Sequence, residues 1–175
     1  REKLNGVAIQ NNPNAEFINQ LLFDFGILKD DITNDVTIFG LIGERSGNVL
    51  RSWEESFREK SVRNEPLREI AKLDRVYPIT KDGPVFVVEN SGVFSSIIDE
   101  LEDCSISIIC THGQFKIAAI QIIKLLAKED CTIYYSGDFD PEGLLMAYAL
   151  KQRYPTNIRY WKYSVEDYIK NLSNV

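Results

Sequence analysis

Three acidic residues and a glycine crowd one junction of the chain. The stretch "DFDPEG", residues 138–143, contains Asp138, Asp140 and Glu142. Like charges this close repel one another, so the arrangement serves either local backbone geometry or a bound cation. Carboxylate oxygens suit Mg²⁺, which keeps several waters and is often completed by substrate phosphate oxygens. The stretch therefore indicates metal-assisted phosphoryl transfer or phosphodiester hydrolysis.

Two of these acids also have an ordinary structural explanation. Asp140 precedes Pro141, and this pair is a good helix start in which the aspartate caps free backbone N–H groups. Glu142 is explained by the helix dipole. Asp138 has no such role, so it most needs a cation or a hydrogen-bond network. A calcium-loop interpretation fails because the closing glutamate would fall on Ala149, in apolar helical sequence.

From residue 84 the sequence alternates between strand-like and helix-like runs. The predicted strands are "PVFVVEN" (84–90), "SISIIC" (105–110), "CTIYYS" (131–136) and "NIRYW" (157–161). The predicted helices cover residues 91–103, 115–129, 141–154 and 164–172. Strands separated by crossover helices form a parallel sheet with helices on its faces. We therefore predict an α/β domain with a four-stranded parallel sheet over residues 84–175.

The predicted strand ends bring acids from different parts of the chain together. In such sheets, ligands bind at the carboxyl ends of the strands, where the winding direction reverses. If the strand order is 2-1-3-4, the reversal lies between the first and third strands, and Glu89 comes beside Asp138 and Asp140. A glutamate at the end of an apolar strand is costly without a partner. We therefore predict that these three acids form a site for Mg²⁺ or Mn²⁺.

Other residues at the strand ends are weaker candidates for substrate contacts. Gly137 and Gly143 would let a phosphate backbone approach closely, although turn geometry and helix packing also explain them. His112 is the single histidine. It could donate a proton or contact substrate, and the plainer interpretation is a polar loop residue. Gln114 and Lys116 could contact phosphate, or could be solvated residues of a helical first turn.

Composition limits the classes of function. The 175 residues, 44% hydrophobic and 26% charged, can bury a core as one domain or one domain with a partial second. The net charge of −6 argues against wrapping nucleic acid by bulk charge, although a bound metal or a partner could supply positive potential. Cys104, Cys110 and Cys131 lack paired spacing, so neither a zinc site nor a disulfide is expected. Without a leader or a long apolar run, we expect a cytoplasmic protein with no membrane contact.

The first 80 residues carry a different pattern. Helical apolar faces occur in "AEFINQLLFDF" (15–25) and "SGNVLRSWEESFREK" (46–60), and one strand-like run, "DVTIFGLI", covers 35–42. We predict a mainly helical N-terminal region over residues 1–80. Because the chain begins at Arg1, we expect this region to be part of a larger, truncated domain.

Several motifs carry a family resemblance. A glutamate after one strand, Asp-x-Asp after a later strand and a glycine at the helix start resemble the Toprim domain of topoisomerases, primases and related nucleases. The stretches "VFVVENSGV", "CTHGQ", "SGDFDPEGLLMAYAL" and "LLFDFGILKDDITNDVTIFGL" are similar to bacterial proteins with a Toprim-like C-terminal domain. That family is related to topoisomerase VI A subunits and to the nuclease subunit of Wadjet-type plasmid-defence systems. Ser136 departs from the histidine found there in many relatives, so no proton-shuttling role is carried over to it.

The resemblance implies a function as well as a Toprim-like, Rossmann-like fold. Glu89, Asp138 and Asp140 would be metal ligands, with Glu89 as an alternative general acid or base. The implied activity is Mg²⁺-dependent cleavage of DNA within a bacterial antiplasmid complex that contains SMC-like subunits. Topoisomerase activity would also need a tyrosine nucleophile. The candidates lie in the linker, the sheet or a helix, so hydrolysis is expected over strand passage: Tyr77, Tyr134, Tyr135 and Tyr148.

Two alternatives remain open. The domain could be a non-catalytic Toprim-like module for nucleic-acid binding or assembly. It could also be another magnesium-dependent phosphotransfer enzyme that acts on a nucleotide.

Overall fold

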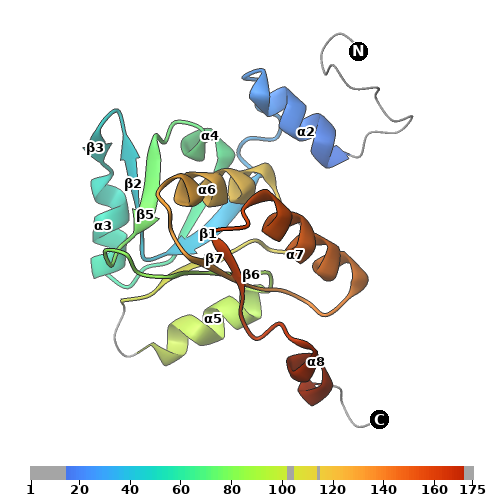
Figure 1. The fold of residues 1–175 in the computed structure, drawn as a ribbon. Helices are drawn as coiled ribbons and strands as arrows, with labels where there is room; N and C mark the ends of the chain where they lie inside the picture. Colours follow the sequence, from blue (N-terminus) through green and yellow to red (C-terminus); the bar gives the residue numbers. More distant parts are fainter. Residues whose placement is uncertain (1–14, 102–104, 114, 172–175) are drawn as a thin grey trace.

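The computed structural model describes residues 15–101, 105–113 and 115–171 (Figure 1). Seven helices lie in these ranges: α2 (Ala15–Asp24), α3 (Arg51–Arg58), α4 (Leu67–Ile70), α5 (Ser91–Glu100), α6 (Ile117–Lys128), α7 (Pro141–Arg153) and α8 (Val165–Asn171). The strands are β1 (Asp35–Phe39), β2 (Leu41–Arg45), β3 (Asn48–Val49), β4 (Arg63–Pro66), β5 (Arg75–Pro78), β6 (Val85–Val88), β7 (Ser107–Cys110), β8 (Ile133–Ser136) and β9 (Ile158–Tyr160). The α/β class is confirmed.

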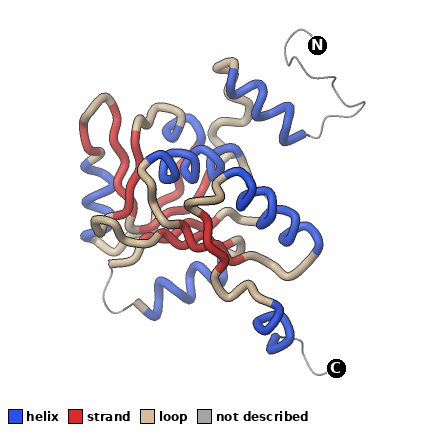
Figure 2. Tube along the Cα trace, viewed as in Figure 1, coloured by secondary structure: helices blue, strands red, loops and turns tan. Residues whose placement is uncertain are grey.

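A mixed six-stranded sheet forms the centre of the molecule (Figure 2). Its order is β4-β1-β7-β6-β8-β9. Strands β7, β6, β8 and β9 are parallel to one another, whereas β1 is antiparallel to both β4 and β7. The parallel part therefore has the predicted order 2-1-3-4, but two further strands extend the sheet beyond β7. The prediction of four strands was incomplete.

In residues 15–80, the described part of the region expected to be mainly helical, five strands accompany three helices. Strands β1 and β4 join the large sheet, and β2, β3 and β5 form a separate three-stranded sheet. The sequences of β4, "RNEP", and β5, "RVYP", are short and rich in charge or proline. They become strands through pairing with β1 and β2, which lie far away in sequence, so local propensity does not reveal them. The helix predicted over 46–60 begins only at Arg51, because β3 takes up the residues before it.

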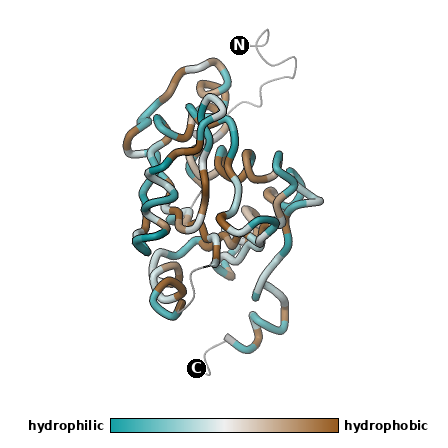
Figure 3. Tube along the Cα trace, turned by 90° about the vertical axis from the view of Figure 1, so that its left-hand side faces the viewer, coloured by the Kyte–Doolittle hydropathy of each residue, from teal (hydrophilic) through white to brown (hydrophobic). Residues whose placement is uncertain are grey.

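Helices cover both faces of the large sheet. One core cluster joins α6 and α7 to β1, β6, β7, β8 and β9, while a smaller cluster on the other face joins α5 to β6 and β7. Figure 1 shows α6 and α7 on the side of the sheet opposite α5. In Figure 3 much of the hydrophobic colour runs through the strands in the middle of the molecule. Nine of the twelve residues of α6 are buried, as expected for a helix packed on several sides, and its two charged residues, Lys124 and Lys128, are not among them.

Two predictions about composition can be compared with the fold. Among the described residues, no helix combines the length and the apolar character that a membrane crossing needs. Cys110 is a buried free thiol and Cys131 a partly buried one. Cys104 lies outside the described residues.

Candidate functional site

The carboxyl ends of β6, β7 and β8 meet at one edge of the sheet. β6 pairs in parallel with both neighbours, and Val88 lies opposite Cys110 on one side and Ser136 on the other. The residues that follow these three positions therefore lie together. β6 is also the strand from which the chain winds in both directions, which is where open α/β sheets bind ligands.

Glu89 is a buried acid at the end of β6, with only 4% of its surface exposed. Its Oε1 accepts a hydrogen bond from the hydroxyl of Tyr135, and its Oε2 accepts one from the backbone N–H of Asp138 at 3.3 Å. Burial raises the pKa of the Glu89 carboxyl, and the charges of Asp138 and Asp140 add to the rise, whereas the two hydrogen bonds oppose it. Glu89 is therefore an acid whose proton affinity is increased by its surroundings.

Asp138 and Asp140 lie at the same edge, between β8 and α7, and both are exposed. The backbone carbonyl of Asp138 accepts a hydrogen bond from the Tyr163 hydroxyl at 2.6 Å. The side chain of Asp140 caps α7, because its Oδ1 accepts the backbone N–H of Gly143 at 2.7 Å. The predicted capping role of Asp140 is thus confirmed.

The two glycines of this junction have structural reasons to be glycine. A Cβ on Gly137 would collide with the Glu89 carboxylate and the Tyr135 hydroxyl. A Cβ on Gly143 would collide with the carbonyl oxygen of Asp138. Both residues allow close packing around the acids, and their contact with a phosphate backbone stays a prediction.

The predicted metal ligands are neighbours but are not gathered around one point. In the part of the chain that the structure describes, no group of three or more histidine, cysteine, aspartate or glutamate side chains is placed to hold a metal ion. The oxygens of Glu89 face Tyr135 and the Asp138 backbone, and Asp140 faces the first turn of α7. The donor chemistry suits Mg²⁺, but these side chains would have to rotate before they formed a ligand set.

An aromatic cluster borders Glu89 on the side of α8. Phe139 stacks on Tyr163 with ring centroids 4.7 Å apart, and Tyr168 packs against Phe139 at 5.5 Å. Tyr163 also contacts the ring of Tyr135 edge-on. Burial and the negative charges of Glu89, Asp140 and Asp138 raise the pKa of Tyr163 to about 12. Tyr163 and Tyr168 are thus packing residues of this cluster, and Tyr163 stays protonated beside the acids at neutral pH.

His112 and Lys116, the predicted contacts at the end of β7, are both bound within the protein. His112 Nε2 lies 2.6 Å from the Thr37 hydroxyl, which in turn donates to Asn64 Oδ1. Lys116 Nζ donates to the carboxylate of Asp35. Gln114 lies outside the described residues. Thr37 and Asn64 were not predicted as neighbours of His112, because their strands were not predicted as part of this sheet.

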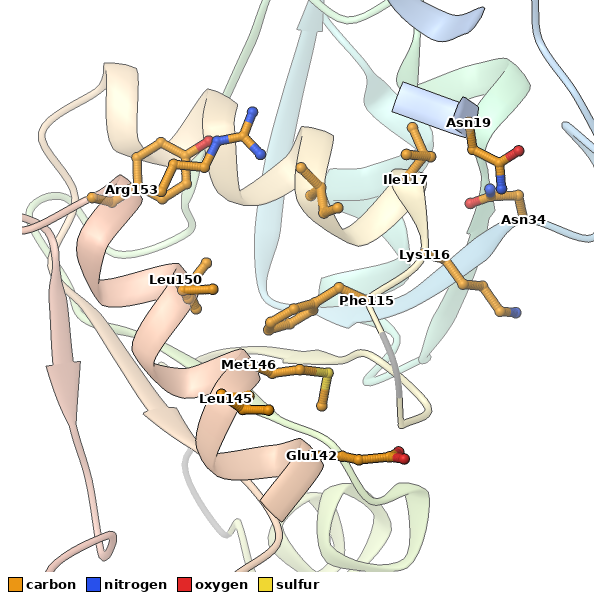
Figure 4. A pocket seen from close by; sticks show the side chains of 13 residues that line it. Asn19, Asn34, Phe115, Lys116, Ile117, Glu142, Leu145, Met146, Leu150 and Arg153 are labelled. Carbon is orange, nitrogen blue, oxygen red and sulfur yellow. The ribbon is translucent and has the colours of Figure 1, made fainter. Parts of the chain in front are cut away.

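A pocket of about 670 Å³ lies between α6 and α7, next to the acidic edge. Figure 4 shows Phe115, Met146 and Leu150 directed into it, with Glu142 at one end and Arg153 at the other. The side chain of Lys116 points away from Phe115 in the same view. The pocket is mainly apolar where the helices face one another, so it differs in character from the acidic edge beside it.

Comparison with known proteins gives one family. No curated protein matches the chain. The family described as "Protein of unknown function C-terminus (DUF2399)" matches residues 64–175, which include Glu89, Asp138 and Asp140 together with the whole parallel part of the sheet. Because the match covers more than half of the sequence, the chain belongs to this family.

Proposed function

We propose that this chain is the Toprim-like part of a Mg²⁺-dependent enzyme that cleaves DNA phosphodiester bonds. The observation that supports it most directly is the position of Glu89. A buried carboxyl with a raised pKa lies at the end of the central parallel strand, where the winding reverses, and it contacts the backbone of Asp138. Perturbed acids in such crevices are frequent members of catalytic sites.

Each acid has a role that suits this chemistry. Glu89 can hold a proton at higher pH than an exposed glutamate does, as a general acid or base requires. Asp138 and Asp140 are exposed at the same edge, so their carboxylates can turn toward a ligand. A bound Mg²⁺ would neutralise phosphate charge and activate water. The order 2-1-3-4 and the placement of one glutamate and Asp-x-Asp at neighbouring strand ends also favour the Toprim relationship.

The biological setting follows from the resemblance to Toprim-like subunits of plasmid-defence systems. We propose that the parent protein acts in the bacterial cytoplasm on plasmid or phage DNA, together with SMC-like subunits. The net charge of −6 is consistent with a partner that supplies the main DNA-binding surface.

A second candidate is a non-catalytic module for DNA binding or assembly. One observation favours it, namely that two of the acids have structural partners. Glu89 accepts hydrogen bonds from Tyr135 and Asp138, and Asp140 caps α7. A fold that keeps these acids for stability alone would retain the same geometry.

Nuclease assays on the full-length parent protein with supercoiled plasmid separate the two candidates. Glu89→Gln and Asp138→Asn should each reduce Mg²⁺- or Mn²⁺-dependent cleavage by at least ~100-fold, a typical contribution of a positioned acid or base. Asp130→Asn is the matched control, since Asp130 is exposed in the turn between α6 and β8 and lies away from the acidic edge. Full cleavage by both site variants would refute the proposed site. DNA binding without cleavage by the wild type would support the second candidate.

A further inference from the structure

A chain of polar side chains crosses three strands beside the acidic edge. His112 Nε2 lies 2.6 Å from Thr37 Oγ1, and the Thr37 hydroxyl donates to Asn64 Oδ1. Thr37 of β1 lies opposite Asn64 of β4 on one side and Cys110 of β7 on the other. The chain of contacts is therefore fixed by strand pairing, and Thr37 itself is only 7% exposed.

Counting protons assigns the direction of each hydrogen bond. A threonine hydroxyl has one proton, and that of Thr37 goes to Asn64 Oδ1, a carbonyl oxygen that can only accept. Toward His112, Thr37 Oγ1 can then act only as an acceptor. The proton between them must belong to His112 Nε2, so in the neutral ring Nδ1 is the nitrogen with a free lone pair.

One further side chain, that of Cys110, lies near Nδ1. Cys110 Sγ lies 3.7 Å from His112 Nδ1 and 3.6 Å from the carbonyl oxygen of Glu89. Burial raises the pKa of the Cys110 thiol, so it keeps its proton and acts as a weak donor. The thiol has one proton, for which the Glu89 carbonyl and an unprotonated Nδ1 are alternative acceptors. Because the Glu89 carbonyl can take the thiol proton, Nδ1 is left able to accept a proton from another group.

The backbone turn at His112 and Gly113 also helps to fix the position of the imidazole ring. His112 has φ 56° and Gly113 has φ 86°, and both values lie in the left-handed region. The turn is tied down by the Gly113 N–H, which donates to the Glu89 carbonyl at 3.0 Å, and by the Thr111 hydroxyl, which donates to the Gly113 carbonyl at 3.1 Å. A histidine in this conformation is uncommon and is kept only where surrounding contacts determine it.

We propose that Thr37 and Asn64 are positioning residues that hold His112 as the neutral tautomer with its proton on Nε2, so that Nδ1 accepts protons at the carboxyl edge of the sheet. The use of Nδ1 during DNA cleavage rests on the proposed function, whereas the tautomer does not. In this way the N-terminal strands β1 and β4 build part of the site, a role that goes beyond supporting the sheet.

The single histidine makes a direct test practical. A long-range ¹H–¹⁵N correlation spectrum of the ¹⁵N-labelled chain, recorded at a pH where the imidazole is neutral, shows which ring nitrogen is protonated. We expect a protonated Nε2 and an unprotonated Nδ1. The Nε2 proton should also be directly visible, because its hydrogen bond to Thr37 slows exchange with water.

Three variants separate positioning from a purely structural effect. Asn64→Leu frees the Thr37 proton to turn toward Nε2, so the population protonated on Nδ1 should rise. Asn64→Asp retains an acceptor oxygen and should keep the wild-type tautomer. Thr37→Val should abolish the visible Nε2 proton signal, whereas Thr132→Val, at an exposed position at the opposite end of the sheet, should leave it unchanged.

The outcomes decide the proposal without DNA or metal in the sample. A wild-type ring protonated on Nδ1 overturns it, and so does an unchanged tautomer in an Asn64→Leu chain whose amide spectrum matches the wild-type fold. If Asn64→Leu fails to fold, the wild-type tautomer and the Thr37→Val signal decide. A nuclease assay that fails while the predicted tautomer is found would refute the proposed function alone.

Discussion

The hydroxyl of Tyr135 donates a hydrogen bond to the buried carboxylate of Glu89, joining the third parallel strand to the end of the first. Tyr135 is fully buried and Glu89 is nearly so. Inside a protein a carboxylate that loses a donor keeps the full cost of its desolvation. This contact is therefore central to whether the acidic edge of the sheet can hold a charge.

Tyr135→Phe should destabilise the fold by about 1–3 kcal/mol, because it leaves one Glu89 oxygen without its donor while it keeps the ring. Urea unfolding at pH 7, followed by circular dichroism, measures the change in free energy of unfolding. Tyr134→Phe is the matched control, since its ring stacks on Phe86 on the other face of the sheet. Equal stability of the two variants would show that the Tyr135 contact contributes nothing.

Stability should depend on pH through Glu89. Its folded pKa is raised above the ordinary value of 4.5, so its contribution is fully present below pH 4.5 and is lost as the pH rises through the folded pKa. Because glutamine does not ionise, the Glu89→Gln variant should not lose stability in this way as the pH rises. The free energy of unfolding of Glu89→Gln minus that of wild type should therefore be larger at pH 7 than at pH 4.

Glu129 provides a control of opposite sign. Its hydrogen bond and ion pair with Arg75 lower its pKa, so its contribution is present above pH 4.5 and is lost as the pH falls through the folded pKa. The free energy of unfolding of Glu129→Gln minus that of wild type should therefore be smaller at pH 7 than at pH 3. The same pH trend in both glutamine variants would contradict the assigned environments.

Much of the parallel sheet could be predicted because its signals are local. Apolar runs separated by amphipathic helices imply parallel strands and crossovers, and this was enough to place Glu89 near Asp138. The cap at Asp140 was likewise visible in the Asp-Pro pair. These features depend on residues that are neighbours in sequence or lie at the end of an obvious strand.

The remaining features depend on long-range pairing. Strand β4, with the sequence "RNEP", has no apolar alternation and exists because it pairs with β1. Without β4 and β1 in the sheet, nothing in the sequence places Thr37 and Asn64 near His112. The contact between Tyr135 and Glu89 was also missed, because side-chain direction at a strand end depends on the close approach that Gly137 allows.

Gly137→Ala should destabilise the fold by about 1–3 kcal/mol, the usual cost of forcing an extra methyl group into a packed site. The added Cβ would meet the Glu89 carboxylate and the Tyr135 hydroxyl. Combining it with Tyr135→Phe removes one of the two colliding groups, so the double variant should be more stable than the sum of the single effects predicts. Strict additivity in a double-mutant cycle would argue against a shared contact.

The two roles of Asp140 can be separated by the choice of substitution. Asp140→Ala removes the cap of α7 and should cost about 0.5–2 kcal/mol in unfolding experiments, whereas Asp140→Asn retains an acceptor for the Gly143 N–H and should change stability little. Asn90→Ala removes the corresponding cap of α5 and provides a reference for the cost of a lost cap. Under the proposed function, Asp140→Asn should reduce cleavage as strongly as Asp140→Ala, because both remove the charge. If Asp140→Asn instead cleaves plasmid at the wild-type rate, Asp140 serves the helix and the acidic site consists of Glu89 and Asp138.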